Sequence, residues 1–148
     1  LFLPGVSRNH SLYLTGAYGV RDTRGQYKFS DRFTYASGYH AVPYRDVYTL
    51  GADYQLPVAY PDWGTTWAYL LRIRLDGFFN YTHARMQPRV TPTSGTYRSL
   101  GATLYFDTQL FSSLSVPWGI RYSYLLDRDF SAPKRTGEIQ LVVPLTFF

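Results

Sequence analysis

The residues able to carry chemistry in this chain are charged side chains that alternate with apolar ones. Arginines and carboxylates share the polar phase of that alternation: Arg72, Arg74, Arg121, Asp53, Asp76, Asp107 and Glu138. Opposite charges on neighbouring strands pair across a sheet, so this set predicts cross-strand pairing that fills or lines a polar interior. The functional alternative is a surface that selects a solute or holds a plug domain.

Patterns for catalysis or metal binding do not occur. The sequence has no cysteine, which excludes a thiolate metal site, a cysteine nucleophile and a disulfide framework. His10, His40 and His83 lie far apart, with no carboxylate companion at ligand spacing. No phosphate-binding loop, dinucleotide fingerprint or nucleophile elbow is present. We therefore expect no enzyme activity, no metal and no cofactor.

The basic residues do not form a run. The formal net charge is +5, but lysine and arginine are dispersed along the chain. Nucleic-acid-binding surfaces gather basic residues on one face or in one segment. We therefore expect no nucleic-acid partner.

The elements that must position the charges are strands. The chain has 15 Tyr, 10 Phe and a single Met, with 12 Gly and 9 Pro spread along it, which favours an all-β fold. Period-2 alternation predicts strands in seven segments: residues 11–20, 27–35, 47–58, 71–83, 99–110, 116–126 and 139–147. The weakest is 27–35, where Asp31 breaks the apolar phase.

The predicted strands are long. Globular strands have about 5–6 residues, whereas a tilted strand that crosses a bilayer needs about 9–11. The opposite phase mixes small Gly, Ser and Thr with charged residues, as barrel lumens do. Apolar runs such as 67–71 are far shorter than the about 20 residues of a membrane helix. We expect an antiparallel transmembrane β-barrel in the outer membrane of a Gram-negative bacterium, with a soluble β-sandwich as the alternative.

Seven is an unsuitable number of strands for a closed barrel. Bacterial single-chain barrels have an even number, and an open sheet edge cannot lie in lipid. An eighth strand over residues 1–8 would close a small barrel, but Pro4 and Gly5 argue against it. We therefore expect residues 1–148 to be one segment, the C-terminal part of a larger barrel whose upstream strands and periplasmic domain are absent.

Several short motifs occur in the order found in a known superfamily. They are Ser37-Gly38-Tyr39, the run from Asp53 to Pro57, the turn from Tyr60 to Gly64, Gly77-Phe78-Phe79-Asn80, Arg98-Ser99-Leu100-Gly101 and the terminal Phe147-Phe148. The chain thereby resembles the C-terminal half of the BamA/TamA, or bacterial surface-antigen, barrels, in the version found in Bacteroidota.

The resemblance implies a loop inside the lumen. In that family an external loop with an Arg-Gly-Phe/Tyr motif folds back into the barrel, is followed by five strands, and pairs with a strand aspartate. Here Ser37 replaces the arginine and Asn80 the aspartate, so the ion pair is neutralised at both ends. The resemblance places Ser37, Asn80 and Asp53 together as a hydrogen-bonded cluster, with Arg32 or Arg45 as replacement cations.

The resemblance also implies function and partners. It predicts a barrel that assembles, translocates or scaffolds other components, embedded among outer-membrane lipid and lipopolysaccharide, with periplasmic or lipoprotein partners. Phe147-Phe148 resembles the terminal signal read by the barrel assembly machinery, although the apolar phase ends on Phe147. The alternatives are a passive pore or structural barrel, and a soluble β-sandwich binding module.

Overall fold

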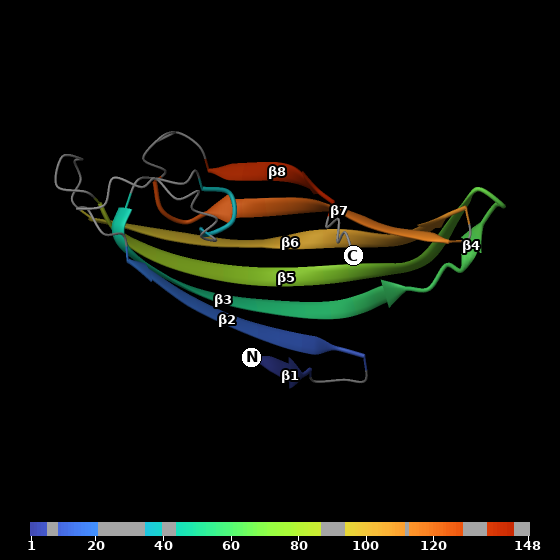
Figure 1. The fold of residues 1–148 in the computed structure, drawn as a ribbon, viewed down its shortest axis with the longest axis horizontal. Coiled ribbons are helices and arrows are strands. Elements are labelled where there is room, and N and C mark those ends of the chain that lie inside the picture. The colour runs from blue at the N-terminus through green and yellow to red at the C-terminus, as the bar shows by residue number, and fades with distance from the viewer. Residues whose placement is uncertain are drawn as a thin grey trace.

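A computed structural model describes residues 1–5, 9–20, 35–39, 44–86, 94–111, 113–128 and 136–143. These residues form strands and their connections: β1 (Phe2–Pro4), β2 (Ser11–Val20), β3 (Tyr44–Ala59), β4 (Trp63–Gly64), β5 (Ala68–Met86), β6 (Ser94–Leu110), β7 (Leu114–Leu125) and β8 (Gly137–Val142). Figure 1 shows the long strands running side by side. The expectation of an all-β fold is confirmed.

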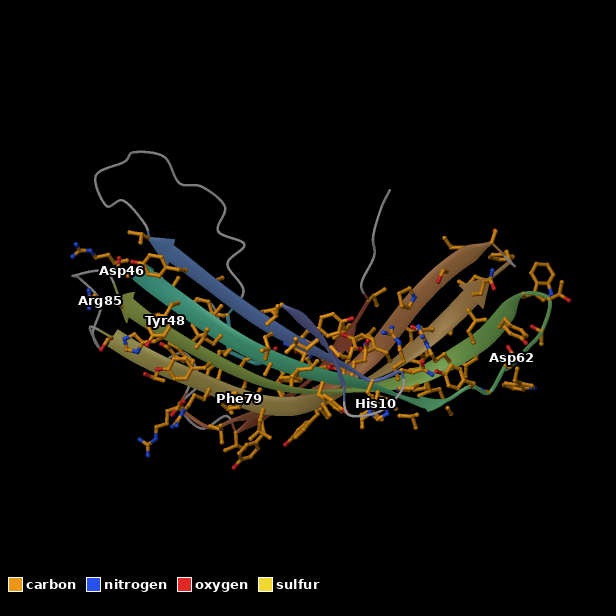
Figure 2. All side chains as sticks on the ribbon, turned by 90° about the horizontal axis from the view of Figure 1, so that it is seen from below. His10, Asp46, Tyr48, Asp62, Phe79 and Arg85 are labelled. Atoms are coloured by element: carbon orange, nitrogen blue, oxygen red, sulfur yellow. The ribbon has the colours of Figure 1, made fainter. Side chains whose placement is uncertain are left out.

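The strands form one antiparallel sheet of eight strands in the order β1-β2-β3-β5-β6-β7-β8, with β4 paired to β5. Figure 2 shows the sheet bent into a trough. Within the described residues β1 and β8 are the two edges and do not pair with each other. The expected antiparallel wall is present, but it is not closed into a barrel.

Most predicted strands are present, and several are longer than predicted. The segments 47–58, 71–83 and 99–110 lie within β3, β5 and β6. Strand β5 begins at Ala68, before the predicted segment. Its register with β6 shifts between Leu70 and Arg72, and such a bulge interrupts the alternation of residues between the two faces. The sequence pattern therefore did not reveal the first residues of β5. The predicted strand 139–147 corresponds to β8, which ends at Val142; residues 144–148 lie outside the described part.

The N-terminal region differs from the sequence prediction. The expectation that Pro4 and Gly5 disfavour a strand there is wrong, because β1 pairs with β2 over Phe2, Leu3 and Pro4. Proline is tolerated there because β1 is an edge strand and needs no donor on its outer side. The predicted strand 27–35 lies outside the described residues except for Tyr35, which is not in a strand, and β2 pairs directly with β3.

The sheet has two distinct ends. At the first, named here the loop end, Val20 lies opposite Asp46 and Tyr124 opposite Gly137, so the connections 21–43, 87–93 and 126–136 all start there. At the second, the turn end, tight connections join β1 to β2 and β6 to β7, and β4 packs beside β5.

The two faces of the sheet differ in chemistry. Phe79 lies on the convex side in Figure 2. Because side chains alternate along a strand, the residues in phase with Phe79 share this face. Leu50 and Ile139 of this face are 57% and 73% exposed. The polar phase therefore lines the concave face, where small polar side chains have no exposed surface: Thr82, Ser99, Thr103 and Ser123.

A small buried core lies on the concave face at the loop end. Its members come from residues 35–39 and from the four neighbouring strands β3, β5, β6 and β7: Ala36, Tyr39, Val47, Ala84, Tyr97 and Leu125. Among the described residues, no helix is long and apolar enough to cross a membrane.

Candidate functional site

The candidate site is the concave face together with residues 35–39, named here the inner loop. Two hydrogen bonds seat the loop on β5. The backbone N–H of Ala36 donates to Thr82 Oγ1 at 3.0 Å, and Asn80 Nδ2 donates to Ser37 Oγ at 3.0 Å. The structure thus brings together Ser37 and Asn80, which lie 43 positions apart in the chain.

Tyr39 fixes the other end of the inner loop. Its hydroxyl lies 2.8 Å from the carbonyl oxygen of Arg98 and 2.9 Å from that of Asp127, and it accepts a hydrogen bond from the Asp127 backbone N–H at 2.9 Å. Its ring packs edge-on against Tyr97, with centroids 5.2 Å apart. The loop is therefore attached both to β5 and to the end of β7.

Gly38 allows the loop to approach the sheet. Its φ of +89° is in the left-handed region that favours glycine. A Cβ atom at this position would lie 2.8 Å from Leu125 Cδ2 and 3.0 Å from Ser123 Cβ. The middle residue of the predicted motif therefore has both a conformational and a steric reason to be glycine.

Arg121 is the cation that faces the inner loop. Its Nε donates to Thr103 Oγ1 at 3.0 Å, and its Nη1 lies 3.5 Å from Ser37 Oγ. The guanidinium carbon lies 5.2 Å from the centroid of the Phe78 ring, within range of a cation–π contact. A guanidinium from β7 therefore lies beside the side chain of Ser37 in the inner loop.

Of the two predicted replacement cations, Arg45 does not take this role, and the prediction for Arg32 is not tested. Arg45 is exposed on β3, and Arg32 lies outside the described part of the chain. Arg121 carries no local sequence signal that marks it as the partner of Ser37. Only the register of β5, β6 and β7 brings it there, because Arg121 lies opposite Thr103, which lies opposite Asp76.

Asp53, Asp76 and Glu138 lie on the same face but make different contacts. Asp53 lies opposite Phe78, and Asp76 opposite Gln55. Both aspartates are near enough to Arg121 to interact with it electrostatically, although neither forms an ion pair with it. Asp53 makes no hydrogen bond to Ser37 or Asn80 among the described residues. Glu138 Oε2 would lie 3.7 Å from a Cβ atom placed on Gly38.

Several buried oxygen atoms under the inner loop have no protein partner within the described part of the chain: Asp76 Oδ1, Ser99 Oγ and Ser123 Oγ. A buried hydroxyl or carboxylate without a hydrogen bond is costly in an apolar surrounding. The concave face is therefore polar even where it is buried.

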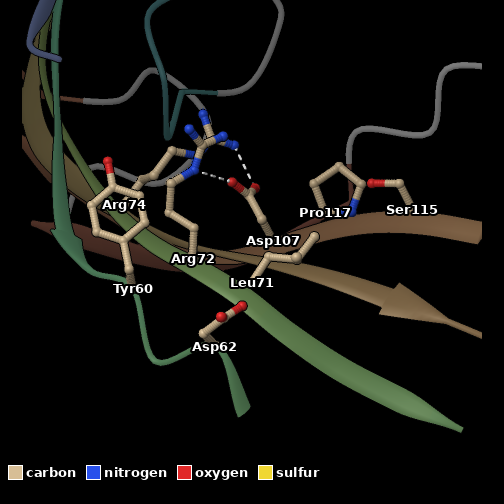
Figure 3. A pocket seen from close by; sticks show the side chains of 8 residues that line it. All are labelled: Tyr60, Asp62, Leu71, Arg72, Arg74, Asp107, Ser115 and Pro117. Carbon is tan, nitrogen blue, oxygen red and sulfur yellow. Dashed lines mark hydrogen bonds and ion pairs between the residues drawn. The ribbon is translucent and has the colours of Figure 1, made fainter. Parts of the chain in front are cut away.

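Towards the turn end, two arginines share one aspartate (Figure 3). Arg72 Nε donates to Asp107 Oδ2 at 2.8 Å, and Arg74 Nη2 donates to Asp107 Oδ1 at 2.7 Å. The Arg74 guanidinium also lies 5.3 Å from the centroid of the Tyr105 ring. Three of the predicted polar-face charges are therefore brought together here, and Tyr105 lies between Arg74 and Arg121, whose Nη2 is 3.4 Å from the Tyr105 hydroxyl.

At the loop end, Arg98 and Asp127 form a bidentate ion pair. Arg98 Nε and Nη2 donate to the two carboxylate oxygens, each at 2.9 Å, and the Arg98 backbone N–H also donates to Asp127. The guanidinium holds the pKa of Asp127 below its ordinary value. Neither residue was predicted as part of the site, because the contact depends on the chain reversal after β7.

Other candidate residues are separate. Phe147, Phe148 and His40 lie outside the described residues, so the predicted terminal signal stays a prediction. His10 contacts the Tyr54 hydroxyl at 2.8 Å, and His83 contacts Thr96 Oγ1 at 3.0 Å. No group of acidic or histidine residues able to hold a metal ion occurs in the described ranges.

No protein-family model, curated protein or solved structure matches this chain.

Proposed function

We propose that this chain forms part of the wall of an outer-membrane β-barrel of the surface-antigen type, with its convex face towards lipid and its concave face towards a polar lumen. The observation that carries the proposal is the inverted burial of the sheet. Large apolar side chains such as Leu50 and Phe79 are exposed, while Thr82, Ser99 and Ser123 are buried. Water-soluble domains do the opposite.

The convex face is too apolar to be stable in water. Its exposed side chains come from every long strand and form a continuous band: Leu14, Leu50, Phe79, Leu100, Ile120, Ile139 and Leu141. Soluble monomers rarely expose contiguous apolar patches larger than a few hundred Å². No second sheet covers the band within the described residues. Contact with lipid chains would remove the free-energy cost of exposing this band to water.

Aromatic residues border the band at both ends. Exposed rings gather at the turn end: Trp63, Trp67 and Phe111. Tyr18, which lies directly opposite Tyr48, borders it at the loop end. From Ile73 to Tyr81 a strand tilted by about 40° rises roughly 20 Å, close to the about 25 Å apolar band of outer-membrane barrels. Such girdles anchor barrels at the two membrane interfaces.

The sheet edges require further strands. Backbone groups at the outer edges of β1 and β8 have no partner strand among the described residues, and unpaired backbone groups cannot face hydrocarbon. We infer that additional strands, upstream or from a second copy, complete the wall.

The seating of the inner loop supports the surface-antigen type. The superfamily inserts a loop into the lumen at the position of Ser37-Gly38-Tyr39 and holds it against a strand at the position of Asn80. Here the Ser37–Asn80 hydrogen bond and the Tyr39 contacts attach this loop to the concave face. The role that follows is assembly, translocation or scaffolding at the outer membrane, within lipid and lipopolysaccharide and with the barrel assembly machinery as partner.

The test is a fractionation of cells that make the protein. We expect it in the outer-membrane fraction, released only by detergent, with a faster gel migration before boiling than after it. Recovery as a monodisperse protein in detergent-free buffer would contradict the proposal and favour a soluble β-sandwich binding module.

A passive pore is the second candidate, supported by the turn end of the concave face, where the cavity lining includes no described residue of the inner loop. A cavity of about 650 Å³ opens there beside Arg72, Arg74 and Asp107. In planar bilayers, a pore would conduct continuously, and Arg72→Gln would change its anion preference. Conductance only after deletion of residues 35–39 would instead indicate a lumen plugged by the inner loop.

A further inference from the structure

Two cavities meet at the turn end of the concave face, around side chains that they share: Tyr60, Arg72 and Arg74. The larger, of about 650 Å³, is also lined by Asp62 and Asp107 (Figure 3). The smaller, of about 280 Å³, is lined by Asn9, Ser11, Gln55, Pro57, Tyr60, Arg72 and Arg74.

The smaller cavity is rich in donors and has no carboxylate among the described residues that line it. Its hydroxyl and amide groups come from Asn9, Ser11, Gln55 and Tyr60, and its charges are two guanidinium groups. A cavity of this kind is complementary to an anion, because each lining polar group can donate a hydrogen bond while none carries a negative charge.

Asp107 does not satisfy all the hydrogen-bond donors of the two guanidinium groups. Asp107 binds Arg72 and Arg74 with one oxygen each. Asp76 also interacts electrostatically with Arg74, but it forms no ion pair with either arginine. Arg74 Nε is buried without a hydrogen-bond partner among the described residues. Asp62, on the wall of the larger cavity, is exposed and forms no ion pair with either arginine.

The size of the smaller cavity limits what it can hold. Pockets for drug-sized ligands have volumes of about 300–1,000 Å³. At about 280 Å³ this cavity suits a single oxyanion group and its nearest substituent. Arginine forks match the geometry of phosphate and carboxylate oxygens, and two forks around one cavity favour the more highly charged phosphate.

We propose that the cavity between Arg72, Arg74, Gln55 and Tyr60 binds a phosphate-type oxyanion, carried by a small solute or by a lipid headgroup. The opening of this cavity into a barrel lumen rests on the proposed function. The chemistry of binding rests only on the lining side chains.

The experiment uses the purified protein in a neutral detergent, with inorganic phosphate as the probe and isothermal titration calorimetry as the readout. Phosphate binding should weaken at least tenfold in Arg74→Gln and in Arg72→Gln. The matched control is Arg85→Gln, since Arg85 is an ion-paired arginine of the same strand that contacts Asp46 at the loop end. It should bind phosphate as the unaltered protein does.

A third variant should act in the opposite direction. Asp107→Asn removes the anion that competes for both guanidinium groups, so phosphate binding should tighten at least threefold. A purely structural role of the arginine pair would not produce a gain in affinity. Should Arg74→Gln fail to fold, the more exposed Arg72, whose side chain is 43% exposed, supplies the loss-of-binding variant.

A second titration, with mixed micelles that contain an anionic phospholipid, distinguishes a lipid headgroup from a small solute as the source of the phosphate group. Binding of the phospholipid but not of inorganic phosphate assigns the site to a headgroup, and the reverse assigns it to a solute. No binding of either, or binding that Arg72→Gln and Arg74→Gln leave unchanged, overturns the proposal. Heat-dependent migration of the same samples reports separately on the barrel, so each proposal can fail alone.

Discussion

The two faces of the trough place consecutive residues of one strand in opposite environments. On β3, Leu50 projects from the convex face and is exposed, whereas Thr49 on the concave face donates to the Tyr81 carbonyl at 3.0 Å and contacts Thr82 Oγ1 at 2.8 Å. The polar face is held together by specific hydrogen bonds and by the inner loop. The apolar face has no described partner and depends on its surroundings.

This difference separates two sources of stability. The concave face resembles a small protein interior, in which single contacts of Gly38, Tyr39 and Asn80 decide whether the loop stays seated. The convex face is sensitive only to polarity, because lipid accepts any apolar shape. Substitutions on the two faces should therefore be destabilising for different reasons.

The largest effect is expected from Gly38→Val. A β-branched residue at φ +89° is strained, and its Cβ would lie 2.8 Å from Leu125 Cδ2. Together strain and overpacking should cost about 4 kcal/mol in the free energy of unfolding, measured by urea titration in lipid vesicles. Gly77→Val is the control, since nothing lies within 4 Å of a Cβ atom there. Equal losses in both variants would argue against a tightly seated loop.

The next effect concerns the convex face. Phe79→Arg places a charge on an exposed residue of the apolar band and should destabilise the protein in vesicles by about 3 kcal/mol. Thr15→Arg tests the concave face, because Thr15 lies opposite Gly51 on the polar phase and is exposed. It should change the free energy of unfolding by less than about 1 kcal/mol. A larger loss at Thr15 than at Phe79 would reverse the assignment of the faces.

Tyr39→Phe is expected to have a smaller effect. It removes the hydroxyl that contacts Arg98 and Asp127 but keeps the ring against Tyr97. The loss of these hydrogen bonds should cost about 2 kcal/mol. Protease cleavage near residue 39 should also accelerate. Tyr48→Phe is the control, since its exposed hydroxyl makes one long contact of 3.4 Å with Tyr81.

The smallest expected effect is a dependence of the free energy of unfolding on pH, which arises from Arg98 and Asp127 at the loop end. Because Arg98 lowers the pKa of Asp127 in the folded state, the pair stabilises the protein fully above the ordinary aspartate pKa. That contribution is lost as the pH falls through the lowered pKa, and it should amount to less than about 1 kcal/mol for a partly exposed pair. Urea midpoints at pH 7 and at pH 3 should differ less in Asp127→Asn than in the unaltered protein.

The alternation of apolar and polar residues was sufficient to predict the all-β class, the long strands and the composition of each face. It was not sufficient near irregularities. The bulge between Leu70 and Arg72 concealed the start of β5, and the edge position of β1 made Pro4 acceptable where a central strand would exclude it.

The candidate site was predicted in part. The motif around Ser37 and its contact with Asn80 came from the resemblance to a superfamily, since no local pattern connects the two positions. The approach of Arg121 to Ser37, and the pairing of Arg72 and Arg74 with one carboxylate, depend on strand register. Register is fixed by the whole sheet, so these contacts required the structure.

The central claim, that the convex face meets lipid and the concave face water, is tested most directly by single cysteines placed along β3. The sequence has no cysteine, so each variant carries one label only. A fluorophore at positions 49 to 56 is quenched in turn by a lipid-attached quencher and by a water-soluble one. The account predicts strict alternation, with lipid quenching at Leu50, Ala52, Tyr54 and Leu56. Quenching from water at both phases would contradict it.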